Sequence, residues 1–102
     1  MGGLNVAGLY TFDGPFGHVD YLLRQSGVYL ISVFNGMHHV VLDIGESHDI
    51  RTRVINHDRA AQWQRHAAGR PLHVSTYYCD EPTRMTMERQ LRAHFNPICG
   101  VR

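Results

Sequence analysis

An Asn-Gly pair at positions 35 and 36 joins two stretches that are rich in β-branched and aromatic residues. Both central residues of a tight hairpin turn adopt a positive φ, which Asn and Gly tolerate better than other residues. The stretches 27–34 and 38–45 therefore predict two antiparallel strands joined by a β-hairpin. This feature constrains the fold strongly, because a hairpin fixes the direction and the register of two strands at once.

The polar segment that follows the hairpin predicts a helix over about residues 47–68. Ser47 or Asp49 can accept a hydrogen bond from an amide of the first turn, and apolar residues then recur at helical spacing. A Gly-Arg-Pro sequence ends the helix, because glycine favours the helix C-terminus and proline cannot continue it. Arg53 and His57 are four residues apart, so they would share one face of this helix.

A third strand and a second helix are predicted in the C-terminal half of the chain. Residues 72–79 are rich in Val, Thr and Tyr, which favour β-strands. Residues 83–95 place Met, Leu and Phe side chains four positions apart along one line, which predicts an amphipathic helix. Glu88 lies beside this line, with Arg84 one turn before it and Arg92 one turn after it.

These elements predict an α+β fold in which a three-stranded, mainly antiparallel sheet is flanked by helices. The 102 residues are enough for one domain, with a core over residues 25–100 and an N-terminal extension over residues 1–24. Within this extension, residues 9–12 alternate like a short strand before a turn at residues 13–15. The extension is expected to cover an edge of the sheet or one side of the core.

Composition describes an ordinary globular protein, with 43% hydrophobic and 19% charged residues. No apolar run approaches the ~20 residues of a membrane span, and the N-terminus lacks the basic region of a secretory signal. We therefore expect a cytoplasmic protein without a membrane partner. The net charge is only +1, but all ten cationic side chains are arginines, which suit phosphate contact. High-GC coding would produce the same preference.

Cysteine and histidine positions predict no structural zinc site. Cys79 and Cys99 are the only cysteines, and no Cys-x-x-Cys or His-Glu-x-x-His spacing is present. Both cysteines are therefore expected to be buried free thiols. His38 and His39 are adjacent strand residues that would point to opposite faces, so they would not hold one ion together. A histidine-rich metal carrier is accordingly the least favoured interpretation.

Several short features match, in order and spacing, those of one nuclease superfamily. They are Gly27-Val28-Tyr29, Asp43-Ile44-Gly45 with Glu46-Ser47 after it, Arg53, His57, Glu88 and Pro97. The chain resembles the GIY-YIG nuclease superfamily over about residues 25–100. The resemblance rests on the combination, because a single tripeptide has little specificity.

The resemblance implies a metal-dependent endonuclease that hydrolyses the phosphodiester bonds of DNA. Tyr29 would orient or deprotonate the attacking water, and Arg53 would hold the phosphate. His57 would move a proton or bond to Tyr29, and Glu88 would bind one Mg²⁺ or Mn²⁺ ion through oxygen. Asp43 occupies the position of the second tyrosine of the family, beside the scissile phosphate.

The chain departs from the family pattern at two positions. Asp43 replaces the second tyrosine, and Gly100 stands where the family usually has an asparagine. A carboxylate at position 43 could repel the phosphate or serve as an additional metal ligand. Two functions therefore stay open: an active endonuclease, or a catalytically impaired domain that binds nucleic acid or a protein. Any sequence specificity would come from loops, a homodimer or a partner protein.

Each candidate residue also has an interpretation without catalysis. Tyr29 suits a strand aromatic packed in the core, and Arg53 and His57 suit the exposed face of a helix. Glu88 suits an ion pair with an arginine one turn away.

Geometry should separate these interpretations. A nuclease site requires four residues to converge on one concave face: Tyr29, Arg53, His57 and Glu88. Strand alternation places Asp43 on the face of Val41, and the carboxylate should project into the same pocket, neutralised by a metal ion or Arg53. Asp43→Tyr is expected to preserve the fold, and to raise cleavage if the native domain is impaired.

Overall fold

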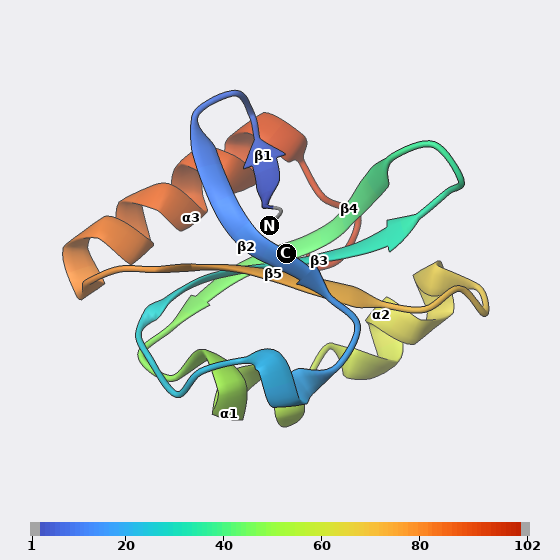
Figure 1. Cartoon of the computed structure of the whole chain (residues 1–102), viewed down its shortest axis with the longest axis horizontal. Helices are drawn as coiled ribbons and strands as arrows, with labels where there is room; N and C mark the ends of the chain where they lie inside the picture. The colour runs from blue at the N-terminus through green and yellow to red at the C-terminus, as the bar shows by residue number, and fades with distance from the viewer. Residues whose placement is uncertain (1–2, 101–102) are drawn as a thin grey trace.

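A computed structural model describes residues 3–100 and shows a five-stranded antiparallel sheet with helices on both faces (Figure 1). The elements in chain order are β1 (Leu4–Val6), β2 (Tyr10–Phe16), the 3-10 helix η1 (Val19–Tyr21), β3 (Gly27–Phe34), β4 (His39–Ser47), α1 (Ile50–Ile55), α2 (Ala60–Ala67), β5 (His73–Tyr78) and α3 (Glu81–Phe95). The strand order is β1-β2-β5-β3-β4. The predicted α+β class is confirmed, but the predicted number of three strands is wrong.

The two additional strands come from the N-terminal extension. β1 and β2 pair with each other, and β2 pairs with β5, where Asp13 lies opposite Thr76 and Phe16 opposite Val74. The turn expected at residues 13–15 is wrong, because these residues belong to β2, whose register shifts between Asp13 and Phe16. This extension adds strands to the sheet and so satisfies backbone groups of β5 that an edge strand would leave unpaired.

The predicted hairpin is confirmed, but within the Asn-Gly pair only Gly36 has the positive φ that was expected of both residues. β3 and β4 pair from Gly27 opposite Ser47 to Phe34 opposite His39. Asn35 closes the turn, since its backbone N–H donates to the carbonyl oxygen of His38 over 3.0 Å. Gly36 has a φ of 96°, a conformation that glycine adopts without steric cost. Because β3 also pairs with β5, it is the central strand of this part of the sheet.

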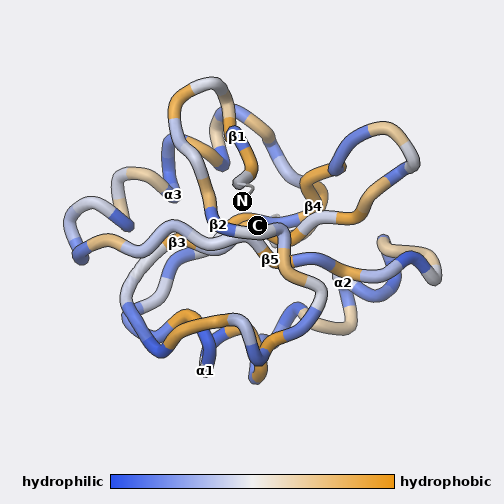
Figure 2. Tube along the Cα trace, viewed as in Figure 1, coloured by the Kyte–Doolittle hydropathy of each residue, from blue (hydrophilic) through white to orange (hydrophobic). Residues whose placement is uncertain are grey.

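Helix α3 lies on one face of the sheet and helices α1 and α2 lie on the other (Figure 1), and each face carries its own cluster of buried hydrophobic residues. Tyr29, Ile31 and Val33 of β3 pack with residues of α1 and α2, whereas the alternate residues Val28 and Leu30 pack with residues of α3. This alternation is the two-residue period of a strand that is covered on both faces. In Figure 2 hydrophilic and hydrophobic residues alternate along the trace of the helices, as expected for helices with one buried face.

The helix predicted over residues 47–68 is interrupted. α1 begins after Asp49, whose side chain accepts from the amide of Thr52 over 3.1 Å, and ends at Ile55. Residues 56–59 then turn His57 into the protein, where it is only 5% exposed, before α2 begins. No Gly or Pro marks this break, and the ring of His57 within it is hydrogen-bonded to the hydroxyl of Tyr29.

The C-terminal half matches its prediction closely. β5 and α3 cover the expected segments, with Asp80 capping α3 and Asn96 ending it in a left-handed conformation. Cys79 and Cys99 are free thiols, and Cys99 is buried while Cys79 is partly exposed. Among residues 3–100, none of the helices has the length and apolar character that crossing a membrane requires.

Candidate functional site

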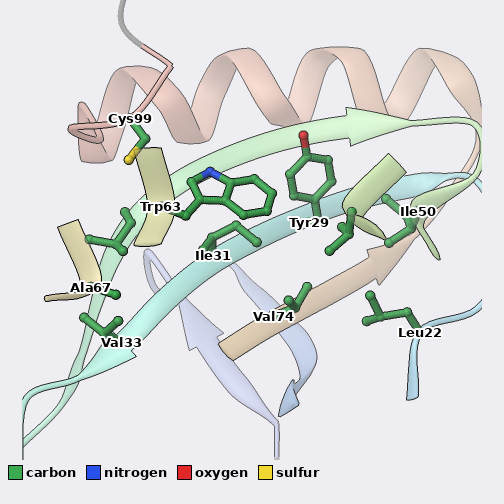
Figure 3. Packing of buried hydrophobic residues seen from close by; sticks show 11 residues of the cluster. Leu22, Tyr29, Ile31, Val33, Ile50, Trp63, Ala67, Val74 and Cys99 are labelled. Carbon is green, nitrogen blue, oxygen red and sulfur yellow. The ribbon is translucent and has the colours of Figure 1, made fainter. Parts of the chain in front are cut away.

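Tyr29 lies on β3, directly opposite Gly45 of β4. Its side chain belongs to the core beneath α1 and α2, beside Trp63, and only 1% of the residue is exposed (Figure 3). A Cβ atom at position 45 would overlap the ring and the hydroxyl of Tyr29. Tyr29 therefore requires a glycine at position 45, because its phenol ring lies across Gly45.

The hydroxyl of Tyr29 is hydrogen-bonded to Nε2 of His57 over 2.5 Å. The backbone N–H of Arg59 donates to Nδ1 of the same ring over 3.0 Å. Since Nδ1 accepts a hydrogen bond, the neutral ring carries its proton on Nε2 and donates it to the Tyr29 oxygen. The predicted bond between His57 and Tyr29 is confirmed.

Both groups of this pair are uncharged at neutral pH. Burial raises the pKa of Tyr29 to about 12, against smaller lowering effects of Arg53 and Arg59. Burial, together with the positive charges of the same two arginines, lowers the pKa of His57 to about 4. A neutral phenol can position a ligand by hydrogen bonding, but it is not a base until a bound cation lowers its pKa.

Arg53 is the accessible cation of the group. It lies in the last turn of α1, its side chain is 38% exposed, and it pairs with the exposed carboxylate of Asp58 over 3.0 Å. It is also close enough to lower the pKa of Tyr29. Tyr29, Arg53 and His57 therefore come together, from β3, α1 and the break after α1.

Asp43 is fully buried and is held by donors from three parts of the chain. Arg59 donates from Nε over 2.8 Å and from Nη2 over 3.2 Å, and Arg92 of α3 donates from Nη1 over 2.8 Å. The indole Nε1–H of Trp63 donates over 2.6 Å, and the amide of Ile44 over 2.9 Å. Although burial opposes ionisation, these bonds hold the pKa of Asp43 below its usual range.

These contacts correct two expectations about Asp43. The expected cation Arg53 is not its partner, because Arg59 and Arg92 neutralise it. The expected strand face is also wrong. The register shifts between Ile31, which pairs with Asp43, and the next residue of β3, which pairs with Val41. This β-bulge breaks the alternation, so Asp43 faces the Tyr29 side of the sheet.

Glu88 lies on α3, on the other side of the sheet. Arg84 and Arg92 share its helix face, and both reach β4, where Arg84 pairs with Glu46 over 2.6 Å and Arg92 bonds to Asp43. Of the four residues expected to converge on one concave face, the structure therefore brings only Tyr29, Arg53 and His57 together, because the buried residues of α3 pack on the opposite face of the sheet from Tyr29. The side chain of Glu88 is half-buried.

The described residues offer limited ligands for a divalent ion. Residues 3–100 contain no group of three or more His, Cys, Asp or Glu side chains that could hold a metal ion. The two carboxylates of β4, Asp43 and Glu46, each already pair with arginine. This donor set fits Mg²⁺ only as a site with one carboxylate, which water and substrate phosphate complete, an arrangement common for this ion.

Sequence reasoning missed Arg59, Arg92 and Trp63 as partners of Asp43. A carboxylate that is buried in a strand requires cationic or N–H partners. The apolar residues on both sides of Asp43 are therefore the sequence signal that such partners exist. Only the fold identifies which residues these partners are.

An apolar cavity of about 380 Å³ lies between η1, α1, α2 and β5 and also borders Trp63. None of the five predicted site residues lines it.

Comparisons with known proteins leave the family unassigned. No family model, no curated protein and no solved structure matches the chain.

Proposed function

We propose that the protein is a metal-dependent endonuclease of the GIY-YIG type that hydrolyses DNA phosphodiester bonds. The observation that carries the proposal is the hydrogen bond between Tyr29 and His57 with Arg53 beside it. Tyr29 and His57 are separated by 28 positions in the sequence, and the resemblance places both of them and Arg53 in one site.

The arrangement suits positioning more than proton abstraction. Arg53 would exchange the carboxylate of Asp58 for a phosphate oxygen, to which a guanidinium binds with two parallel hydrogen bonds. Tyr29 accepts the Nε2 proton of His57, so its own O–H is directed toward another acceptor, a water or a phosphate oxygen. Glu88 would hold Mg²⁺ or Mn²⁺, which supplies Lewis-acid polarisation of the phosphate when bound.

The impaired domain is the second candidate, and two observations favour it. Tyr29 is 1% exposed, and Asp43, in place of the second tyrosine, is fully enclosed. The arginines are also largely committed. Of the nine arginines among residues 3–100, five form ion pairs with carboxylates: Arg51, Arg53, Arg59, Arg84 and Arg92. Such a domain would bind DNA or a protein without cleaving a bond.

Nicking of supercoiled plasmid with Mg²⁺ or Mn²⁺ separates the candidates. The endonuclease proposal predicts metal-dependent nicking that Arg53→Ala and Glu88→Ala each reduce by roughly a hundredfold or more. Arg65→Ala is the control, because this exposed arginine of α2 lies outside the proposed site. Folding of every variant is checked by circular dichroism.

Each other outcome has a definite meaning. DNA binding without nicking by the native chain supports the impaired domain. If the native chain neither binds nor nicks DNA, this result contradicts the DNA proposals. Nicking that survives both substitutions contradicts the assignment of the site.

A further inference from the structure

Ser32, His39 and His73 form a polar cluster across three neighbouring strands. Ser32 of β3 lies directly opposite His73 of β5, and its hydroxyl is hydrogen-bonded to Nδ1 of His39 of β4 over 3.0 Å. The two imidazole rings have centroids 5.2 Å apart and planes at 83° to each other. The cluster lies on the α3 face of the sheet, away from Tyr29.

The cluster contains a ring nitrogen without a partner. Nδ1 of His73 is buried and makes no hydrogen bond to any described residue. A buried nitrogen in this state is costly unless another group satisfies it. His39 and His73 are each only partly buried as residues, so the cluster lies near the protein surface.

The spacing of the rings fits two ligands of one ion. Two imidazoles that each bind a tetrahedral zinc ion at about 2.0–2.1 Å have ring centroids roughly 5 Å apart. Ser32 engages Nδ1 of His39, which leaves Nε2 for a metal and orients the ring, as a hydrogen bond to the second nitrogen does in known sites.

We infer that His39 and His73 bind one divalent transition-metal ion such as Zn²⁺, Ni²⁺ or Cu²⁺. These ions prefer imidazole nitrogen, whereas Mg²⁺ prefers oxygen, so the site is separate in place and chemistry from the proposed magnesium site at Glu88. Residues 3–100 provide no cluster of three or more ligands, so water completes the coordination and the ion exchanges.

His38 and His39 do not form a joint site, because neighbouring residues of one strand point to opposite faces. The inferred site pairs His39 with a residue 34 positions away, which only the β4-β3-β5 strand order brings close.

Zinc titration of the full chain in excess Mg²⁺, followed by calorimetry and thermal unfolding, tests the inference. The native chain should bind one Zn²⁺ per molecule and gain thermal stability from it. His39→Gln and His73→Gln should each abolish this binding, and Ser32→Ala should weaken it roughly tenfold. His66→Gln is the matched control, because His66 lies on α2 on the other face of the sheet, and it should bind as the native chain does.

Absence of zinc binding by the native chain, or unchanged affinity in either histidine variant, overturns the inference. Should a variant fail to fold, Cu²⁺ added to the native chain gives an independent answer by NMR. Its paramagnetism should first broaden the amide signals around positions 32, 39 and 73. Broadening centred on any other histidine contradicts the site.

Discussion

Replacing Asp43 by Asn tests whether the buried carboxylate supports the fold. The substitution keeps the shape and removes the charge, and it places an amide N–H₂ against donors from Arg59, Arg92 or Trp63. A buried ion pair that loses one partner costs about 3–5 kcal/mol. The remaining guanidinium groups keep some contact with water, since the side chains of Arg59 and Arg92 are 27% and 13% exposed. We therefore expect a loss of about 3 kcal/mol in the free energy of unfolding, near the lower end of that range.

Urea unfolding followed by circular dichroism measures this loss. Asp58→Asn is the matched control, because it removes the carboxylate of an exposed ion pair with Arg53 and should leave the midpoint nearly unchanged. A midpoint for Asp43→Asn equal to that of the control would refute the claim that the network stabilises the fold. The enclosure of Asp43 also changes the expectation for Asp43→Tyr, which should now disrupt folding, because the larger ring displaces the arginines and Trp63.

Two further predictions concern the residues that surround Tyr29. Gly45→Ala should unfold the chain or destabilise it by more than about 3 kcal/mol in denaturant titration, because its Cβ would overlap Tyr29, whereas Gly17→Ala should be tolerated, because a Cβ at position 17 meets no atom within 4 Å. Native-like stability of Gly45→Ala would contradict this packing. His57, with its pKa lowered from 6.5 to about 4, should contribute roughly 3 kcal/mol above pH 6.5, and this contribution should be lost progressively as pH falls toward 4. A pKa near 6.5 for His57 in an NMR titration would show that the ring is not buried as described.

Local sequence signals predicted the elements that local chemistry determines. The Asn35-Gly36 turn, the Asp49 cap of α1 and the span of α3 all depend on residues within a few positions of one another. The N-terminal strands were underestimated, because only the pairing of β2 with β5 makes residues 13–16 part of the sheet.

Part of the candidate site, including one of its contacts, was predictable from the sequence. The resemblance named Tyr29 and His57, and the structure brings them within hydrogen-bonding distance. The environment of Asp43 could not be predicted, because a β-bulge reverses the alternation of its strand and its partners lie 16, 20 and 49 residues away. Such long-range ion pairs leave no periodic pattern in a sequence.

Tyr29→Phe tests the proposed function most directly. This variant removes only the hydroxyl that bonds to His57, and the ring keeps its packing against Gly45 and Trp63. With Mg²⁺ or Mn²⁺ and a plasmid that the native chain nicks, the folded variant should cleave at least about a hundredfold more slowly. Cleavage by Tyr29→Phe at the native rate would contradict the account and would leave Tyr29 as an aromatic residue of the core.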